Sequence, residues 1–183
     1  MQDSRFSHRI ATNADKQDIM ALMSAAIEQN MRAFLTPEEI EAARATMGID
    51  QTLIDDGTYF LIEATVDGRT HLVGCGGWGM RRTLYGGNHT VGRDDSLSDP
   101  ATEPARIRAM YTHPDWVRQG IGTLLLDLGE AAARRAGFKT IELGSTVAGE
   151  PLYSARGYRA LSRDEQVSAS GAINVVIRMS KPL

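Results

Sequence analysis

Apolar residues recur at helical spacing in the first part of the chain. Between about Asp15 and Asn30 they lie three and four residues apart, which places them on one face of a helix. After a short polar connection, Thr36 precedes a proline and two glutamates, a combination typical of a helix start. The pattern therefore predicts a second helix from Pro37 to about Asp55. The apolar face of the first helix comprises Ile19, Leu22, Met23, Ala26 and Ile27.

A third amphipathic helix is predicted directly after Gly120 and Gly122. It ends near Gly137, since glycine commonly terminates helices. A shorter helix is predicted from about Gly149 to Arg156. The apolar face of the third helix comprises Ile121, Leu124, Leu125, Leu128 and Ala132, and its predicted solvent-facing residues are Asp127, Glu130, Arg134 and Arg135.

Segments rich in β-branched and aromatic residues alternate with these helices and predict strands. The second and third strands are joined by Asp67-Gly68, a strong hairpin signal. This order of elements, with one strand–helix–strand unit, predicts an α+β (mixed α/β) domain with a mainly antiparallel sheet. The predicted strands are His8–Thr12, Thr58–Val66, Thr70–Met80, Ala105–Thr112, Thr140–Thr146 and Asn174–Ser180.

The segment from Arg81 to Pro104 shows almost no apolar periodicity and contains the pairs Gly86-Gly87 and Asp94-Asp95. Loops of this length are uncommon in compact domains and are often functional. One interpretation is a loop beside the substrate, and the other is an excursion over the surface. The sequence leaves both open.

Composition narrows the class of protein. The chain has 183 residues, of which 42% are apolar and 23% charged, and its net charge is −3. These values are ordinary for one globular domain and argue against a nucleic-acid-binding protein. No segment is apolar enough for a membrane span, and the first residues lack the apolar core of a signal peptide. We therefore expect a cytoplasmic protein with no membrane or nucleic-acid partner.

The single cysteine, Cys75, lies in the small-residue run VGCGGWG and cannot form an intramolecular disulfide. Most cysteines of this kind are buried small residues, so a catalytic thiol is the less favoured interpretation. A lone cysteine also fits a reducing compartment.

Two glycines stand at the start of the third helix, although glycine disfavours helix formation. Their presence needs another reason, and one is an anion-binding site. At a helix N-terminus the first N–H groups are unpaired and the helix dipole is positive. Gly120 and Gly122 would let a phosphate approach these N–H groups, and Arg118 adds a cation beside them. The alternative is a tight turn that binds no ligand.

The type of phosphate ligand is restricted by the residues around the turn. The phosphate-binding loop motif of nucleotide hydrolases needs a lysine that is absent here. A dinucleotide site would use Glu142 as the ribose-binding acid, but Leu125 stands where its third glycine belongs. Arg106 and Arg108 in the preceding strand also differ from the apolar residues of a buried parallel strand. The dinucleotide site is therefore kept only as a minor alternative.

The run AMYTHPDWVRQGIGTLLL, followed by TIELGST and AGEPLYSARGYRAL, resembles the acetyl-CoA-binding core of the GCN5-related N-acetyltransferases (GNATs). Their signature, Gln or Arg, two residues, Gly, one residue, then Gly or Ala, matches Val117 to Gly122 except for the valine. A second family element, Leu-Tyr-x-x-x-Gly-Tyr, spans Leu152 to Tyr158. The resemblance, which is firm over 105–161, implies a twisted, mostly antiparallel sheet flanked by helices. It implies one GNAT domain over 1–183, with an insertion at 81–104.

The resemblance also implies a reaction and a set of site residues. The family transfers an acetyl group from acetyl-CoA to an amine, here an amine of a small molecule or a protein. Backbone N–H groups at the glycine turn would hold the pyrophosphate, and the end of the preceding strand would pair with pantetheine and polarise the thioester carbonyl. Tyr153 would assist the leaving thiolate, the alternative being an aromatic core residue. The implied cofactor-binding residues are Met110, Tyr111, Thr112, Val117, Arg118, Gln119, Gly120, Ile121, Gly122 and Thr123.

The base that deprotonates the amine is not evident, because Arg106 stands where some family members have a glutamate. Water is one alternative, and the carboxylates and the histidine nearby are others. The four histidines show no ligand spacing, so no metal is expected. The substitute bases considered are Glu103, His113, Glu142 and Glu150, and the residues considered for the acceptor pocket are Trp78, Tyr85, Asp94 and Asp95.

Two further questions stay open. Family members often form homodimers, but nothing in this sequence decides the oligomeric state. A protein that keeps the acyl-CoA-binding fold as a non-catalytic sensor or binding module is the alternative to an enzyme.

Overall fold

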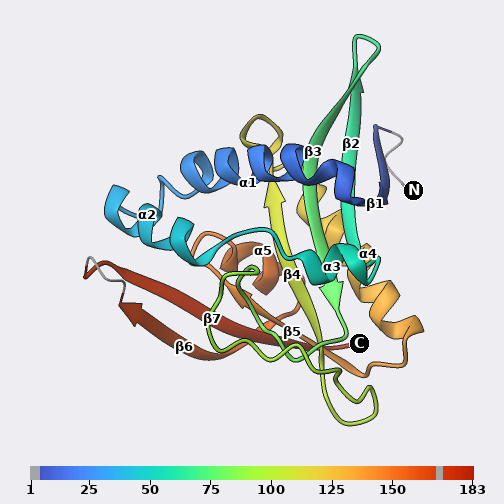
Figure 1. Cartoon of the computed structure of the whole chain (residues 1–183), viewed down its shortest axis with the longest axis vertical. Coiled ribbons are helices and arrows are strands. Elements are labelled where there is room, and N and C mark those ends of the chain that lie inside the picture. Colours follow the sequence, from blue (N-terminus) through green and yellow to red (C-terminus); the bar gives the residue numbers. More distant parts are fainter. Residues whose placement is uncertain (1–4, 168–170) are drawn as a thin grey trace.

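A computed structural model describes residues 5–167 and 171–183. These residues form a seven-stranded sheet in the order β1-β2-β3-β4-β5-β7-β6 (Figure 1). Every neighbouring pair is antiparallel except β4 and β5, which are parallel. The predicted α+β fold with a mainly antiparallel sheet is confirmed.

The helices and strands follow the predicted order closely. The two 3₁₀ turns are η1 (Asn13–Asp15) and η2 (Pro114–Trp116). The helices are α1 (Lys16–Asn30), α2 (Pro37–Thr46), α3 (Gln51–Asp55), α4 (Ile121–Arg135) and α5 (Glu150–Ala155). The strands are β1 (Phe6–Ile10), β2 (Tyr59–Val66), β3 (Arg69–Gly79), β4 (Ala105–Thr112), β5 (Thr140–Ser145), β6 (Arg159–Val167) and β7 (Ile173–Pro182).

The predicted helix from Pro37 to Asp55 is wrong, because the chain forms two helices there. Met47 has extended backbone angles after α2, and Asp50 starts α3 by accepting the N–H of Thr52. A Cβ atom at Gly48 would lie 2.8 Å from the His89 ring. The segment between α2 and α3 is therefore shaped by contact with the loop after β3 and not by helix propensity.

Strand β6 was not predicted from the sequence. It lies at the edge of the sheet (Figure 1) and pairs only with β7 within the described residues. Most of its residues are exposed to solvent. A strand that buries neither face needs no alternation of apolar and polar residues. The sequence RALSRDEQV accordingly carries no strand pattern.

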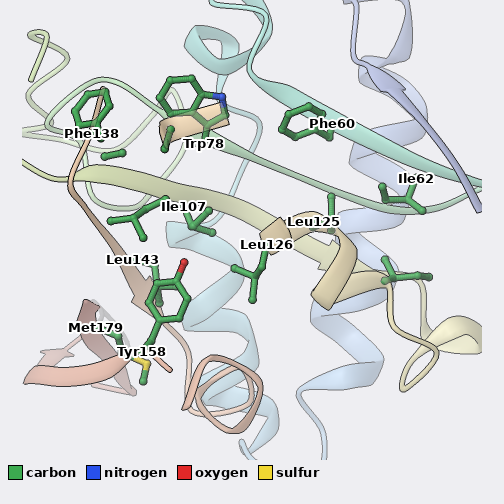
Figure 2. Packing of buried hydrophobic residues seen from close by; sticks show 14 of the residues in the cluster. Phe60, Ile62, Trp78, Ile107, Leu125, Leu126, Phe138, Leu143, Tyr158 and Met179 are labelled. Atoms are coloured by element: carbon green, nitrogen blue, oxygen red, sulfur yellow. The ribbon is translucent and has the colours of Figure 1, made fainter. Parts of the chain in front are cut away.

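The larger core lies between the sheet and α4 (Figure 2). Ile121, Leu125 and Leu126 project from α4 onto alternate residues of β2, β4 and β5. Leu124 and Leu128 pack at its margin and are only partly buried. Each fully buried side chain of this size stabilises the fold by about 1.5–3 kcal/mol.

Glu130 on α4 was expected to face solvent and is instead 2% exposed. Its carboxylate accepts the Tyr158 hydroxyl at 3.1 Å and pairs with the Lys181 ammonium at 2.8 Å. The prediction failed because both partners come from distant segments of the chain. A buried carboxylate is tolerated here because it is fully paired.

The opposite face of the sheet carries α1, α3 and the segment 81–104 (Figure 1). Ile19, Leu22 and Leu53 pack there against residues of β2 and β3. Cys75 belongs to this second core and is fully buried, as predicted. The two cores fix β4 from both sides.

Candidate active site

Strands β4 and β5 are joined only at their beginnings. Ala105 pairs with Ile141 and Arg106 with Glu142, and no further pair forms between the two strands within 105–145. The second half of β4 therefore has backbone groups on its β5 side that pair with no strand. Peptide groups left in this way need another partner.

A bulge turns this end of β4. Ala109 has φ +50°, and the register against β3 shifts by one residue at the same point. A non-glycine residue in this conformation costs about 1–3 kcal/mol, and such strain is concentrated at functional sites.

The backbone direction after the bulge follows from strand pairing. The His113 N–H donates to the Val73 carbonyl on β3 at 2.9 Å. Because alternate residues of an antiparallel strand face the same neighbour, Tyr111 also faces β3, whereas Met110 and Thr112 face away from it. The Met110 and Thr112 N–H groups thus point to the side where β5 has diverged. The Thr112 carbonyl accepts Asn30 Nδ2 at 2.8 Å.

The small residues of β3 permit this geometry. A Cβ atom at Gly76 would lie 2.7 Å from Met110 Cγ, and one at Gly74 would lie 2.3 Å from Ile121 Cγ2. Glycine at these two positions lets the bulge and the start of α4 lie directly against β3. The run VGCGGWG is therefore the sequence signal of the bulge.

The glycine turn leads into α4. Gly120 is the N-cap at φ +91°, and an added Cβ atom would meet nothing within 4 Å. No side chain of the described residues caps this helix end, and its first turn holds no acidic residue. Arg118, at φ +62°, is exposed beside it. Open space above uncapped N–H groups and a neighbouring cation fit a phosphate group.

Glycine is needed at position 122 for a different reason. A Cβ atom there would lie 2.6 Å from Leu152 Cδ2 on α5. The second glycine of the signature thus permits close packing of α5 on α4. The open space at Gly120 thus fits the approach of an anion, whereas Gly122 makes room for the Leu152 side chain.

Tyr153 lies beside the bulge. Its hydroxyl is 3.8 Å from Met110 Sδ, and its ring packs edge-on against Tyr158 with 5.9 Å between centroids. Burial raises the pKa of Tyr153 to about 12. The structure therefore brings Tyr153, the end of β4 and the start of α4 into one region, with a hydroxyl that stays protonated at neutral pH.

Under the loop 81–104 lies a buried ionic cluster that the sequence did not reveal. Asp50 Oδ2 accepts Arg108 Nη2 at 2.8 Å, and Asp50 Oδ1 accepts Arg93 Nη2 at 3.1 Å. Arg108 also donates to the carbonyls of Thr83 and Gly86. Burial lowers the pKa of Arg108, and the Asp50 charge opposes that shift. This cluster ties the loop to β4 one residue before the bulge.

The polar residues of β4 are therefore buried, contrary to the sequence-based argument that treated Arg106 and Arg108 as unlike a buried strand. They are 8% and 5% exposed. Arg106 Nη1 lies 3.0 Å from Glu142 Oε2, which Arg178 also approaches at 2.8 Å. Glu142 is therefore held within the sheet by two arginines and does not fit the role of a ribose-binding acid.

The other candidate bases are also engaged. Glu103 pairs with Arg82 at 2.7 Å, and Glu150 pairs with Arg163. His113 Nδ1 accepts the Asp115 N–H at 3.2 Å and caps η2. Strand β4 itself contributes arginines and no carboxylate to the site.

The residues considered for the acceptor pocket lie apart. Trp78 is in the core beneath α4, edge-on to Phe138 (Figure 2), so this assignment is wrong. Asp94 accepts the Ser96 N–H and hydroxyl, and Asp95 accepts Thr83 and Arg93. Tyr85 packs over Gly144 and hydrogen-bonds to Gln166 on β6. Tyr85 thus lies over the part of β5 that β4 no longer pairs with.

Metal-ligand clusters and membrane-spanning helices are both absent from the described part of the chain. Among residues 5–167 and 171–183, no three His, Cys, Asp or Glu side chains form a group that could hold a metal ion. None of the helices described there is long and apolar enough to cross a membrane.

The sequence of this chain matches a known protein family. The model of the acetyltransferase (GNAT) family matches residues 21–158, which is most of the chain. The chain belongs to the GNAT acetyltransferase family. This match confirms the family that the glycine turn and the Leu-Tyr-x-x-x-Gly-Tyr element predicted. GNAT acetyltransferases use acetyl-CoA. A comparison with curated proteins finds no match.

Solved structures show the same fold. A GCN5-related N-acetyltransferase described as an aminotransferase, class II, from Rhodopseudomonas palustris is 22% identical, with a TM-score of 0.67 over 100% of this chain and 99% of that one. The paia N-acetyltransferase from Thermoplasma acidophilum, solved with coenzyme A, is 13% identical, with a TM-score of 0.61 over 97% and 99%. yncA from Salmonella typhimurium, solved with its cofactor acetyl-CoA, is 20% identical, with a TM-score of 0.59 over 98% and 95%. At these identities the likeness establishes the fold.

Proposed function

We propose that this GNAT protein is an N-acetyltransferase that acts on an amine of a small molecule or a protein. The observation that carries the proposal is the divergence of β4 from β5. It leaves the Met110 and Thr112 N–H groups without a partner on β5, beside Tyr153 and close to the uncapped start of α4. We also propose that residues 1–183 form one GNAT domain.

The residues at this site fit acetyl-CoA, which supplies the activated acetyl group when bound. The N–H groups from Val117 to Thr123 would hold its pyrophosphate, with Gly120 leaving the approach open. The end of β4, Met110 to Thr112, would pair with the pantetheine arm. Within it, the Met110 and Thr112 N–H groups have the direction needed to stabilise negative charge on a carbonyl oxygen.

Tyr153 would act as a hydrogen-bond donor to the leaving thiolate. Its raised pKa makes proton transfer to a thiolate near 8.5 unfavourable by several kcal/mol at equilibrium. The hydroxyl therefore stabilises developing charge by hydrogen bonding and remains a donor over the physiological pH range.

The attacking amine must lose a proton, and an alkylamine near pKa 10.4 is mostly protonated at pH 7. Strand β4 offers no carboxylate for this purpose, and Glu103, Glu142 and Glu150 are ion-paired. We therefore propose that solvent water takes the proton.

The absence of a carboxylate on β4 also favours a second candidate function, a non-catalytic sensor of acyl-CoA. The two functions differ in one observable. A sensor would bind acetyl-CoA tightly and release no coenzyme A with any amine, whereas an enzyme would release it with at least one class of amine.

The first test is thermal unfolding with acetyl-CoA, coenzyme A, NAD and NADP added separately. A ligand at 100 times its Kd adds about 2.7 kcal/mol of stability, which corresponds to about 5–10 °C in Tm for a chain of this size. We expect this shift with acetyl-CoA and coenzyme A and none with the dinucleotides. A shift with NAD or NADP alone would contradict the proposal.

Replacing Gly120 by alanine is expected to lower the free energy of unfolding by about 1–2 kcal/mol, because its φ of +91° is unfavourable for an L-residue. Gly57 is the matched control: it has φ +69°, also with open space around an added Cβ atom, at a distant turn. Urea unfolding should show a similar loss for both variants. Only Gly120→Ala should also weaken coenzyme A binding in titration calorimetry. Equal affinities in the two variants would place the pyrophosphate elsewhere.

A further inference from the structure

The bulge in β4 is bordered by two buried side chains that have no part in the proposed chemistry. Tyr59 is 2% exposed and Cys75 is fully buried on the α1 face of the sheet. The Tyr59 hydroxyl lies 3.1 Å from the Ala109 carbonyl oxygen and 3.2 Å from Cys75 Sγ. The peptide group between Ala109 and Met110 thus ends on this pair of side chains.

The donors and acceptors of this group match. The Ala109 carbonyl can only accept, so the Tyr59 hydroxyl donates its one proton there. Burial raises the pKa of Cys75 to about 12, so the sulfur keeps its proton and can donate it to the Tyr59 oxygen. Removal of one member leaves a buried polar group unpaired, which is costly.

The bulge needs such support. Ala109 has a positive φ that alanine rarely adopts, and the surrounding structure must impose it. If the bulge relaxed by one residue, the backbone groups that now face β5 would turn toward β3. The Met110 N–H would then be directed away from the region of Tyr153.

We propose that Tyr59 and Cys75 are positioning residues that hold the Ala109 bulge and so direct the Met110 and Thr112 N–H groups toward the acyl group. This inference rests on the proposed function of that strand end. Neither side chain touches the reacting atoms. Their effect should therefore fall on the rate of acetyl transfer and on the local mobility of β4, and not on the anchoring of coenzyme A at α4.

The test compares Tyr59→Phe with Thr58→Val. Thr58 is the neighbouring residue, is 4% exposed, and donates its hydroxyl to the Leu53 carbonyl at 3.4 Å, away from the bulge. Both variants lose one buried hydroxyl. We expect Tyr59→Phe to lower kcat about tenfold and to leave the Kd of coenzyme A within about twofold of wild type. In ligand-free protein, amide hydrogen exchange at 110–112 should accelerate about tenfold.

Thr58→Val should leave kcat and exchange at 110–112 unchanged. Cys75→Ser, which keeps a donor and an acceptor, should stay near wild type, whereas Cys75→Ala should behave like Tyr59→Phe. Wild-type exchange at 110–112 in Tyr59→Phe, or equal acceleration in Thr58→Val, would overturn the proposal. If the wild-type protein neither binds acetyl-CoA nor transfers acetyl, the proposed function fails, and the exchange data alone still decide whether this pair holds the bulge.

Discussion

Replacing Tyr153 by phenylalanine is expected to lower kcat about 100-fold. Loss of one positioned hydrogen-bond donor to developing negative charge costs about 10²–10³-fold in kcat, and the Tyr153 hydroxyl lies 3.8 Å from Met110 Sδ at the bulge. The KM for acetyl-CoA should change little, because the ring and its packing on Tyr158 are kept. Steady-state kinetics with a reporter for free coenzyme A measures both constants.

The pH profile gives an independent check on Tyr153. Burial raises its pKa to about 12, so the neutral phenol persists from pH 6 to 10 and the donor is not lost there. Between pH 6 and 10, ionisation of Tyr153 should therefore cause no fall in the wild-type rate. The pH profiles of wild type and Tyr153→Phe should have the same shape. The control is Tyr158→Phe, which loses the hydrogen bond to Glu130 but keeps the ring. A kcat for Tyr153→Phe within a factor of three of wild type would contradict the assigned role.

The largest effect on stability is expected at Asp50. Its side chain is 1% exposed and carries the only negative charge within hydrogen-bonding distance of Arg108 among the described residues. Asp50→Asn keeps a helix-capping side chain but leaves Arg108 and Arg93 without that charge. Breaking a buried ion pair in this way costs about 3–5 kcal/mol. Urea unfolding measures the loss directly.

Glu28→Gln serves as the comparison for Asp50. Glu28 pairs with Arg32 one helical turn away, and both side chains are more than half exposed. Exposed pairs of this kind contribute at most about 0.5 kcal/mol. A loss below 1 kcal/mol for Asp50→Asn would mean that water or the loop carbonyls compensate Arg108. Increased proteolysis within 81–104 should accompany the destabilisation, since Arg108 and Arg93 both hold that loop.

Elements that bury one regular face were predictable from the sequence. Helix α1 and the hairpin of β2 and β3 follow from apolar spacing and from Asp67-Gly68. Strand β6 escaped because it buries neither face, and Glu130 was misplaced because Lys181, which pairs with it, is 51 residues away. Pairings between distant residues leave no periodic signal in a single sequence.

The same limit applies to the site. The glycine turn is a local motif and could be found, together with the family to which it belongs. Asp50 and Arg108 are 58 residues apart, and each taken alone has the pattern of a surface charge. The support of the bulge by Tyr59 likewise spans 50 residues to Ala109. Which of the motif residues contact acetyl-CoA stays a prediction.

Cys75 is the single sulfhydryl of the chain and lies sealed beneath α1 and α3, against the strand that bears the bulge. A thiol reagent can reach this sulfur only when that part of the sheet opens, because the thiolate must be both formed and exposed. The labelling rate of the native protein under fast reclosing therefore reports the free energy of that local opening. The native cysteine thus serves as a built-in probe of local opening of the central strands, with no engineered label.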